Sequence, residues 1–192
     1  MATITGLFPD SMRADAAVRG LTAAGFDAQN VQVMARDTSV KDFALQPAGV
    51  TADALAGGAG NGAIVGGLGG FLVGLGLLAI PGIGPVLATG ALATALASTA
   101  AGAVAGAAAG SVIVALVGFG VAEEDAPAYA EGIKRGGVLV AVSGADNRAG
   151  EARSILNANG AVDISNKRNE WSTAGWKSFD PATVPDERYP RF

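Results

Sequence analysis

This chain of 192 residues contains no cysteine and no histidine. Without cysteine it can form no disulfide and no thiolate nucleophile, and it lacks the usual nitrogen and sulfur ligands of metal ions. Histidine is also the side chain most often used as a general base near neutral pH. No serine has a visible base to activate it. The sequence therefore predicts a protein that is not an enzyme, with no catalytic residue, metal ligand or cofactor.

Positive charge is also scarce, because 13 lysines and arginines stand against 17 acidic residues and leave a net charge of -4. The cations are scattered along the chain, so there is no basic patch of the kind that binds nucleic acid. The first residues, 1–6, lack the basic and apolar regions of a secretory signal. We therefore expect no nucleic-acid partner and a cytoplasmic location for the soluble part of the chain.

Charge is absent altogether from the long stretch 54–122, which is rich in glycine and alanine. Small residues recur at spacings of four on both sides of a proline-glycine break, and glycine at this spacing lets helix backbones approach closely. The stretch predicts two helices, 57–80 and 86–121, that form a glycine-zipper hairpin with its turn at 81–85. The residues expected to pack helices or copies together are Gly58, Gly62, Gly66, Gly70, Gly74, Gly102, Gly106 and Gly110, and those of the turn are Pro81, Gly82, Gly84 and Pro85.

The segments on either side of this stretch share one pattern of strand, aspartate-capped helix, glycine and strand. In the first, a strand at 3–8 precedes Asp10, a helix, Gly25 and a strand at 31–34. In the second, a strand at 137–142 precedes Asp146, a helix, Gly160 and a strand at 161–164. Two such units commonly form a ferredoxin-like sandwich. We therefore expect an α+β fold, with a ferredoxin-like domain split between 3–36 and 137–165 and interrupted by the hairpin at 54–122.

Two further segments complete the organisation of the chain. Residues 123–135 predict an amphipathic helix that opens with three acidic residues and closes with Lys134 and Arg135, which suits the helix dipole. The acidic residues would also suit a hard cation. Residues 166–192 predict an extended aromatic tail. Its aromatic residues either dock on a neighbouring subunit or a bilayer, or cover the tail's own sheet; they are Trp171, Trp176, Phe179, Tyr189 and Phe192.

The surroundings of the uncharged stretch stay open at the sequence level. The first predicted helix, 57–80, would be about 36 Å long and could cross a bilayer, whose hydrocarbon core is about 30 Å thick. The second, 86–121, would be about 54 Å long and carries mostly alanine, which suits helix–helix contact better than lipid. The expected partners are therefore other copies of this chain and, where the hairpin lies in a bilayer, membrane lipid.

Two segments carry a resemblance to a known family. They are Pro81-Gly-Ile-Gly-Pro-Val-Leu-Ala-Thr-Gly90 and the segment from Gly120 to Val140. In them the chain resembles the bacterial general stress protein family, also described as heat-induced or low-temperature-induced stress proteins. The resemblance covers roughly residues 3 to 165 and implies a small α/β domain interrupted by a glycine-rich hydrophobic segment, with stress-linked expression. It supplies no catalytic residue.

Together these features predict a non-enzymatic, stress-associated structural protein. It would assemble with itself through glycine-zipper hairpins, in or on a membrane, at the cytoplasmic face of the inner membrane. The alternative is a soluble cytoplasmic shell or ring of several copies, whose apolar interior holds lipid or another hydrophobic cargo. In both cases the uncharged stretch is the contact surface.

Overall fold

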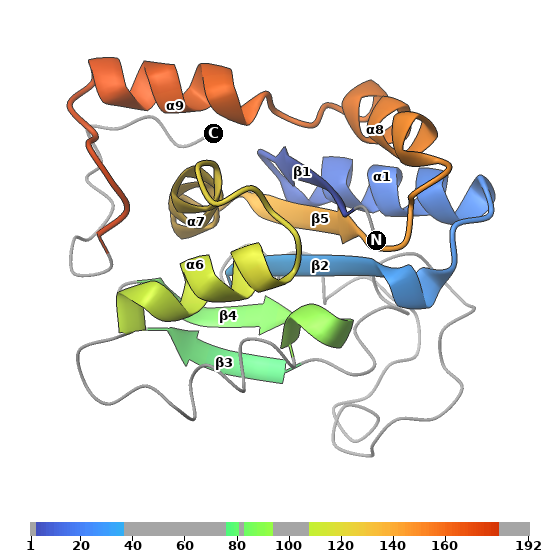
Figure 1. Ribbon diagram of the computed structural model, residues 1–192, viewed down its shortest axis with the longest axis horizontal. Helices are drawn as coiled ribbons and strands as arrows, with labels where there is room; N and C mark the ends of the chain where they lie inside the picture. The colour runs from blue at the N-terminus through green and yellow to red at the C-terminus, as the bar shows by residue number, and fades with distance from the viewer. Residues whose placement is uncertain (1–2, 37–75, 81–82, 94–107, 181–192) are drawn as a thin grey trace.

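The structure is a computed structural model, which describes residues 3–36, 76–80, 83–93 and 108–180 (Figure 1). It is an α+β fold built on one sheet. The elements up to the end of the sheet hairpin are β1 (Ile4–Phe8), α1 (Ser11–Ala23), a 3-10 turn (Ala28–Asn30), β2 (Val31–Arg36), β3 (Gly76–Ile80) and β4 (Gly84–Ala88). They are followed by α6 (Ala108–Gly118), α7 (Ala126–Lys134), β5 (Val138–Val142), α8 (Ala149–Ala158) and α9 (Ile164–Thr173).

The sheet has five described strands in the order β1-β5-β2-β4-β3, and every neighbouring pair is antiparallel. Strand β5 lies between β1 and β2, so Val142 is opposite Ile4 on one side and Val31 on the other. A single antiparallel bridge joins Val162 to Leu7 on the outer side of β1. The two strand-helix units of the sequence therefore share one sheet.

Alternate residues of the central strands point to opposite faces, as the pleat of a strand requires. Val33 of β2 and Val140 of β5 belong to a core beneath α1 and α8. Met34 and Leu139, one residue along, belong to a second core beneath α6 and α7. Figure 1 shows α1 and α8 on one side of the sheet and α6 and α7 on the other. Both faces are covered, which explains why β5 is buried throughout.

The predicted ends of α1 are confirmed. The Asp10 side chain accepts a hydrogen bond of 2.8 Å from the Arg13 amide, as an N-cap should. At the other end Gly25 has a φ of 83°, and the Phe26 amide donates to the Leu21 carbonyl. The predicted cap of α8 is wrong, because that helix begins after Arg148 and not at Asp146.

The predicted helical hairpin is wrong around its turn. Residues 76–80 and 84–88 are the strands β3 and β4, which pair from Gly76 with Ala88 to Ile80 with Gly84. Of the residues predicted for the turn, Ile83 is in a turn, while Gly84 and Pro85 belong to β4. Short uncharged segments suit a strand as well as a helix, so periodicity alone cannot separate the two. The open edge of β2 decides the outcome, because β4 pairs with it from Val86 to Ala88.

The predicted extended tail is also wrong at its start, because residues 164–173 form α9. The Asp163 carboxylate accepts hydrogen bonds from the amides of Ser165 and Asn166, at 2.9 and 3.1 Å. This cap starts the helix at Ile164, inside the strand predicted at 161–164. That strand is consequently reduced to the single bridge at Val162.

Several predicted packing residues lie outside the described part of the chain. They are Gly58, Gly62, Gly66, Gly70, Gly74, Gly102 and Gly106, together with Pro81 and Gly82 of the turn and Tyr189 and Phe192 of the tail. Gly110 lies in α6. Within the ranges that the structure describes, no helix has both the length and the apolar character needed to cross a bilayer.

Candidate functional site

Helix α7 lies at the centre of the second core, between the sheet, α6 and α9 (Figure 1). Its residues 128–134 are all buried, including the charged side chains of Glu131 and Lys134. The helix predicted at 123–135 is confirmed over Ala126–Lys134. Buried charges must be paired or hydrogen-bonded to be tolerated, so the partners of these side chains define the candidate site.

Glu131 and Arg135 form an ion pair one helical turn apart. Arg135 Nε donates to Glu131 Oε1 at 2.8 Å, and both side chains are only 6% exposed. The guanidinium carbon of Arg135 lies 4.8 Å from the ring centre of Trp171 in α9. Arginine stacks well on an aromatic face. Glu131 therefore holds the planar guanidinium of Arg135, at the end of α7, against the face of an aromatic ring of α9.

Lys134 holds the segment that follows α9. Its Nζ donates to the backbone carbonyl of Asp180 at 2.6 Å and lies 5.6 Å from the centre of the Phe179 ring. The side chain is only 1% exposed. Burial lowers the pKa of Lys134, and the carboxylates of Glu131 and Asp180 partly offset that effect. Lys134 is therefore a buried anchor for the chain at Phe179 and Asp180.

Arg36 connects the end of β2 to the end of α7. Its Nη1 donates to the Lys134 carbonyl at 2.7 Å, which satisfies one of the free carbonyls at the end of that helix. At the other end of α7, Tyr129 accepts a hydrogen bond of 3.1 Å from the Thr5 hydroxyl of β1. Burial raises the pKa of Tyr129. Both ends of α7 are therefore fixed to the sheet.

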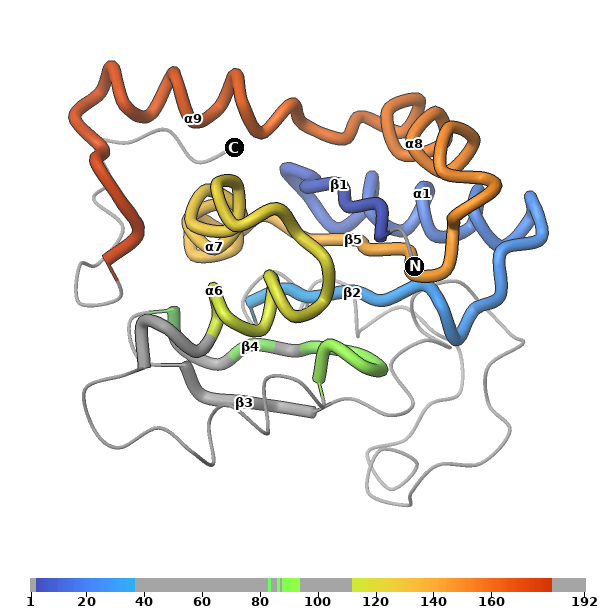
Figure 2. Tube along the Cα trace, in the orientation of Figure 1, coloured from blue at the N-terminus to red at the C-terminus, as the bar shows by residue number. Residues whose placement is uncertain are grey.

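Three of the predicted tail residues are brought together on α7. Trp171 is 2% exposed, and its ring meets that of Trp176 edge to face at 6.0 Å. Phe179 belongs to the same core, and Trp176 packs against it. Figure 2 shows α9 crossing above α7, with the chain after it descending beside that helix. In this structure the three aromatic residues lie in or against the second core of their own chain, beside α7. Docking of the tail on a neighbouring subunit or a bilayer stays a prediction.

Sequence reasoning assigned Lys134 and Arg135 only a role at the helix end. The sequence does carry a signal for this site, because Glu131 is three and four residues before Lys134 and Arg135. When such a helix is buried, its charged side chains need aromatic or backbone partners. Of the three acidic residues before α7, Glu123 and Glu124 are exposed and Asp125 pairs with Arg168 of α9 at 3.2 Å. In the described ranges no group of three or more acidic residues is placed to hold a metal ion.

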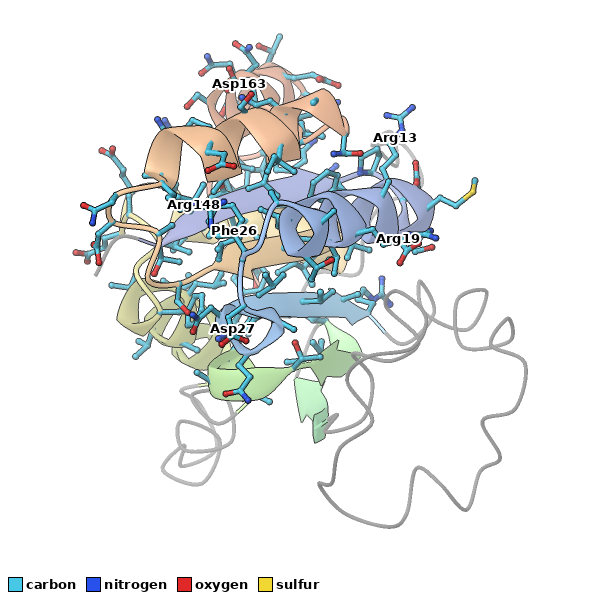
Figure 3. The ribbon with its side chains drawn as sticks, turned by 90° about the vertical axis from the view of Figure 1, so that its right-hand side faces the viewer. Arg13, Arg19, Phe26, Asp27, Arg148 and Asp163 are labelled. Atoms are coloured by element: carbon cyan, nitrogen blue, oxygen red, sulfur yellow. The ribbon has the colours of Figure 1, made fainter. Side chains whose placement is uncertain are left out.

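A third cation–aromatic contact joins the two halves of the fold on the opposite face of the sheet. Arg148 lies 4.0 Å from the centre of the Phe26 ring, and Figure 3 shows the two side chains together between α8 and the end of α1. The guanidinium also donates to the Ala24 and Gly25 carbonyls and to both oxygens of Glu151. These donors are used within the chain, so Arg148 joins α1 to α8.

Comparison with known proteins adds no relative: no family model, curated protein or solved structure matches the chain. The chemistry available at α7 is therefore judged from its own geometry. The charged groups there bind aromatic rings and backbone carbonyls, so the arrangement is suited to anchoring a segment of polypeptide.

Proposed function

We propose that this chain is a non-enzymatic, stress-associated structural protein that assembles with itself through its uncharged central stretch, in or on a membrane. The observation that carries the proposal is the outward side of α6. Val114 there is 57% exposed, while Ile113 and Val117 are half-buried and pack against the second core. A helix of that stretch thus presents an apolar side chain outward, and in this proposal a second copy covers it.

The role of the folded body in this proposal is to space and orient the copies. We infer that the body has a ferredoxin-like arrangement, with β3 and β4 added at one edge. The order of Val162, β1, β5 and β2 supports this inference, because each of the two helices α1 and α8 connects strands with one strand between them. Stress association rests on the family resemblance in the sequence.

The second candidate is a soluble shell or ring of several copies at a cytoplasmic location. One observation favours it, namely that part of the uncharged stretch is built into the folded body. Ile83, Val86 and Leu92 are buried in the second core, as are Val112 and Leu116 of α6. Residues in a protein core are not available to lipid, so the stretch is not a simple two-helix anchor.

Fractionation separates the two candidates. Cells producing the full chain are lysed without detergent and centrifuged at high speed, and the pellet is then washed with alkaline carbonate. We expect the chain in the washed membrane pellet if it is membrane-embedded, and as a large particle of defined size in the supernatant if it is a soluble shell. A chain that stays monomeric in the supernatant refutes self-assembly in both forms.

Substitution tests the contact surface itself. Replacing Gly66, Gly70 and Gly106 by leucine should abolish assembly, because close packing of small residues would be blocked. The matched control is Gly150→Leu in the first turn of α8, where an added Cβ would meet no atom within 4 Å. Assembly that survives the triple substitution, measured by light scattering, contradicts the glycine-zipper mechanism. Loss of assembly in the control instead points to a general effect of the added leucine.

A further inference from the structure

Helix α8 is followed directly by the dipeptide Asn159–Gly160. Asparagine is a thermolabile residue, and it loses its side-chain amide most readily before glycine, because glycine has no side chain to hinder attack by its own backbone nitrogen. In the described ranges no other asparagine precedes a glycine, and the same dipeptide at Asn61–Gly62 lies outside them. The end of α8 therefore carries a candidate site of chemical modification.

The reaction at such a dipeptide needs only the chain and water. The backbone nitrogen of Gly160 attacks Asn159 Cγ, the Cγ–Nδ2 bond breaks, and Nδ2 leaves as ammonia with the proton that the Gly160 nitrogen gives up. Water then opens the cyclic imide at either of its two carbonyls, which leaves aspartate or isoaspartate at position 159. No oxidant, metal or cofactor is consumed, so the local backbone decides whether the reaction takes place.

The fold holds both reacting groups in other hydrogen bonds. The attacking nitrogen of Gly160 donates to the Asn157 carbonyl at 2.9 Å. The leaving group, Asn159 Nδ2, donates to the Ile155 carbonyl at 2.8 Å. Asn159 has a ψ of 10°, which turns the Gly160 nitrogen towards the helix and away from the Asn159 side chain. In this conformation the attack cannot occur.

The helix end is also packed against α1, which keeps it closed. A Cβ added at Gly20 of α1 would lie 3.0 Å from Ile155 Cγ2 and 3.5 Å from Asn159 Nδ2, so the two helices meet closely at this turn. The next amide, that of Ala161, donates to the Leu156 carbonyl at 3.0 Å and completes the cap. The Asn159 peptide can turn towards its side chain only after these bonds break and the end of α8 opens.

We propose that Asn159 is a deamidation site gated by the end of α8, unreactive while that end is closed, reactive when it opens, and unable to close in the same way afterwards. Aspartate has no N–H to donate to the Ile155 carbonyl, and it adds a negative charge at the negative end of the helix dipole. Isoaspartate also lengthens the main chain by one atom, which displaces the cap donors of Gly160 and Ala161. The modified fraction therefore grows with the time that this helix end has spent open.

Peptide mapping of the full chain tests the gate. The chain is incubated at mildly alkaline pH, both folded and unfolded in urea, and digested with trypsin. Cleavage after Arg153 and Lys167 releases the peptide 154–167, which excludes Asn61, and tandem mass spectrometry locates the modified position within it. We expect Asn159 to react several-fold faster than Asn157 in urea, and several-fold slower in the folded chain than in urea. Equal rates for Asn159 in the two states overturn the gate, and no reaction in urea overturns the site.

Substitution tests the consequence of the reaction. Asn159→Asp carries one of the two products, and Asn157→Asp is the matched control, because it adds the same charge to the same helix end at an exposed side chain. We expect Asn159→Asp to unfold at a lower urea concentration than the control, with amide hydrogens at the end of α8 exchanging several-fold faster. Equal unfolding and equal exchange in the two variants would show that the cap does not need the Asn159 amide, and would overturn the proposal that the site cannot close again.

Discussion

The turn between α6 and α7 offers the sharpest test of the fold, through the substitution Gly120→Ala. Gly120 has a φ of 106°, and a Cβ added there would lie 2.8 Å from the Thr3 hydroxyl and 3.0 Å from the Thr3 Cβ. The hydroxyl already donates to the Phe119 carbonyl at 2.8 Å. The new methyl group therefore meets the first residue before β1, which a hydrogen bond holds in place.

The expected loss has a backbone part and a contact part. A left-handed conformation costs alanine about 1–2 kcal/mol. Forcing an extra methyl group into a packed site costs about 1–3 kcal/mol more. Gly120→Ala should therefore lower the free energy of unfolding by about 2–5 kcal/mol, a large share of the stability of an ordinary domain.

Gly25→Ala measures the backbone part alone, so its comparison with Gly120→Ala gives the contact part. Gly25 has a similar φ of 83°, but a Cβ added there would meet no atom within 4 Å. The backbone part and the change in the unfolded chain are shared by the two variants, so their difference should be about 1–3 kcal/mol. Urea denaturation followed by circular dichroism measures both. Adding Thr3→Ala to Gly120→Ala should recover part of the difference. Equal losses at Gly120 and Gly25, with no recovery, would refute the packing of this turn against β1.

Three further predictions concern the cation–aromatic contacts. Burial lowers the pKa of Lys134, so between that lowered pKa and the ordinary value of 10.5 the unfolded chain binds more protons than the folded chain. The free energy of unfolding should therefore rise with pH in this range, and its slope against pH should be smaller in Lys134→Met. A denaturation series from pH 7 to pH 10 in which the two slopes agree would contradict this. Trp171→Ala should cost about 3–5 kcal/mol and Trp171→Phe clearly less, measured by thermal unfolding; equal and small effects would mean that the ring is not in the core. Arg148→Lys should destabilise the contact between α1 and α8, because lysine cannot make the forked contact with Glu151 or stack on Phe26 in the same way. Faster hydrogen exchange at the end of α1 would report this loss, and unchanged exchange would oppose it.

The sequence predicts the parts of this fold whose signals are local. Asp10 and Gly25 mark the ends of α1 because caps act on neighbouring amides and carbonyls. The β-branched run at 138–142 predicts β5 for the same kind of reason. Capping also accounts for one error. Asp146 is predicted to cap a helix and does not cap α8, whereas Asp163, which is predicted to lie in a strand, caps α9 by accepting two backbone hydrogen bonds.

The errors arise where a distant partner decides the local structure. Residues 76–88 contain no charge and read equally as helix or strand. They become strands where β4 can pair with β2, a strand some fifty residues earlier in the chain, and such pairing is invisible in a local pattern. The site at α7 is hidden for a related reason. Lys134 and Arg135 resemble an ordinary helix end until Trp171 of α9 and Phe179 after it are placed against them.

Charged side chains are buried in α7, whereas an apolar side chain is exposed on α6. This contrast indicates which of the two helices a second copy should contact. In α7 the charged side chains of Glu131 and Lys134 are buried, and they bind parts of the same chain. In α6 a valine of a helix without any charge is more than half exposed. Burying this valine against another apolar surface would contribute about 25 cal/mol per Å² of apolar area. The proposed self-assembly therefore predicts that assembly buries surface on α6. Hydrogen exchange of the full chain should therefore show protection rising in α6 on assembly while α7 stays protected throughout, and a rise in α7 alone would contradict this view.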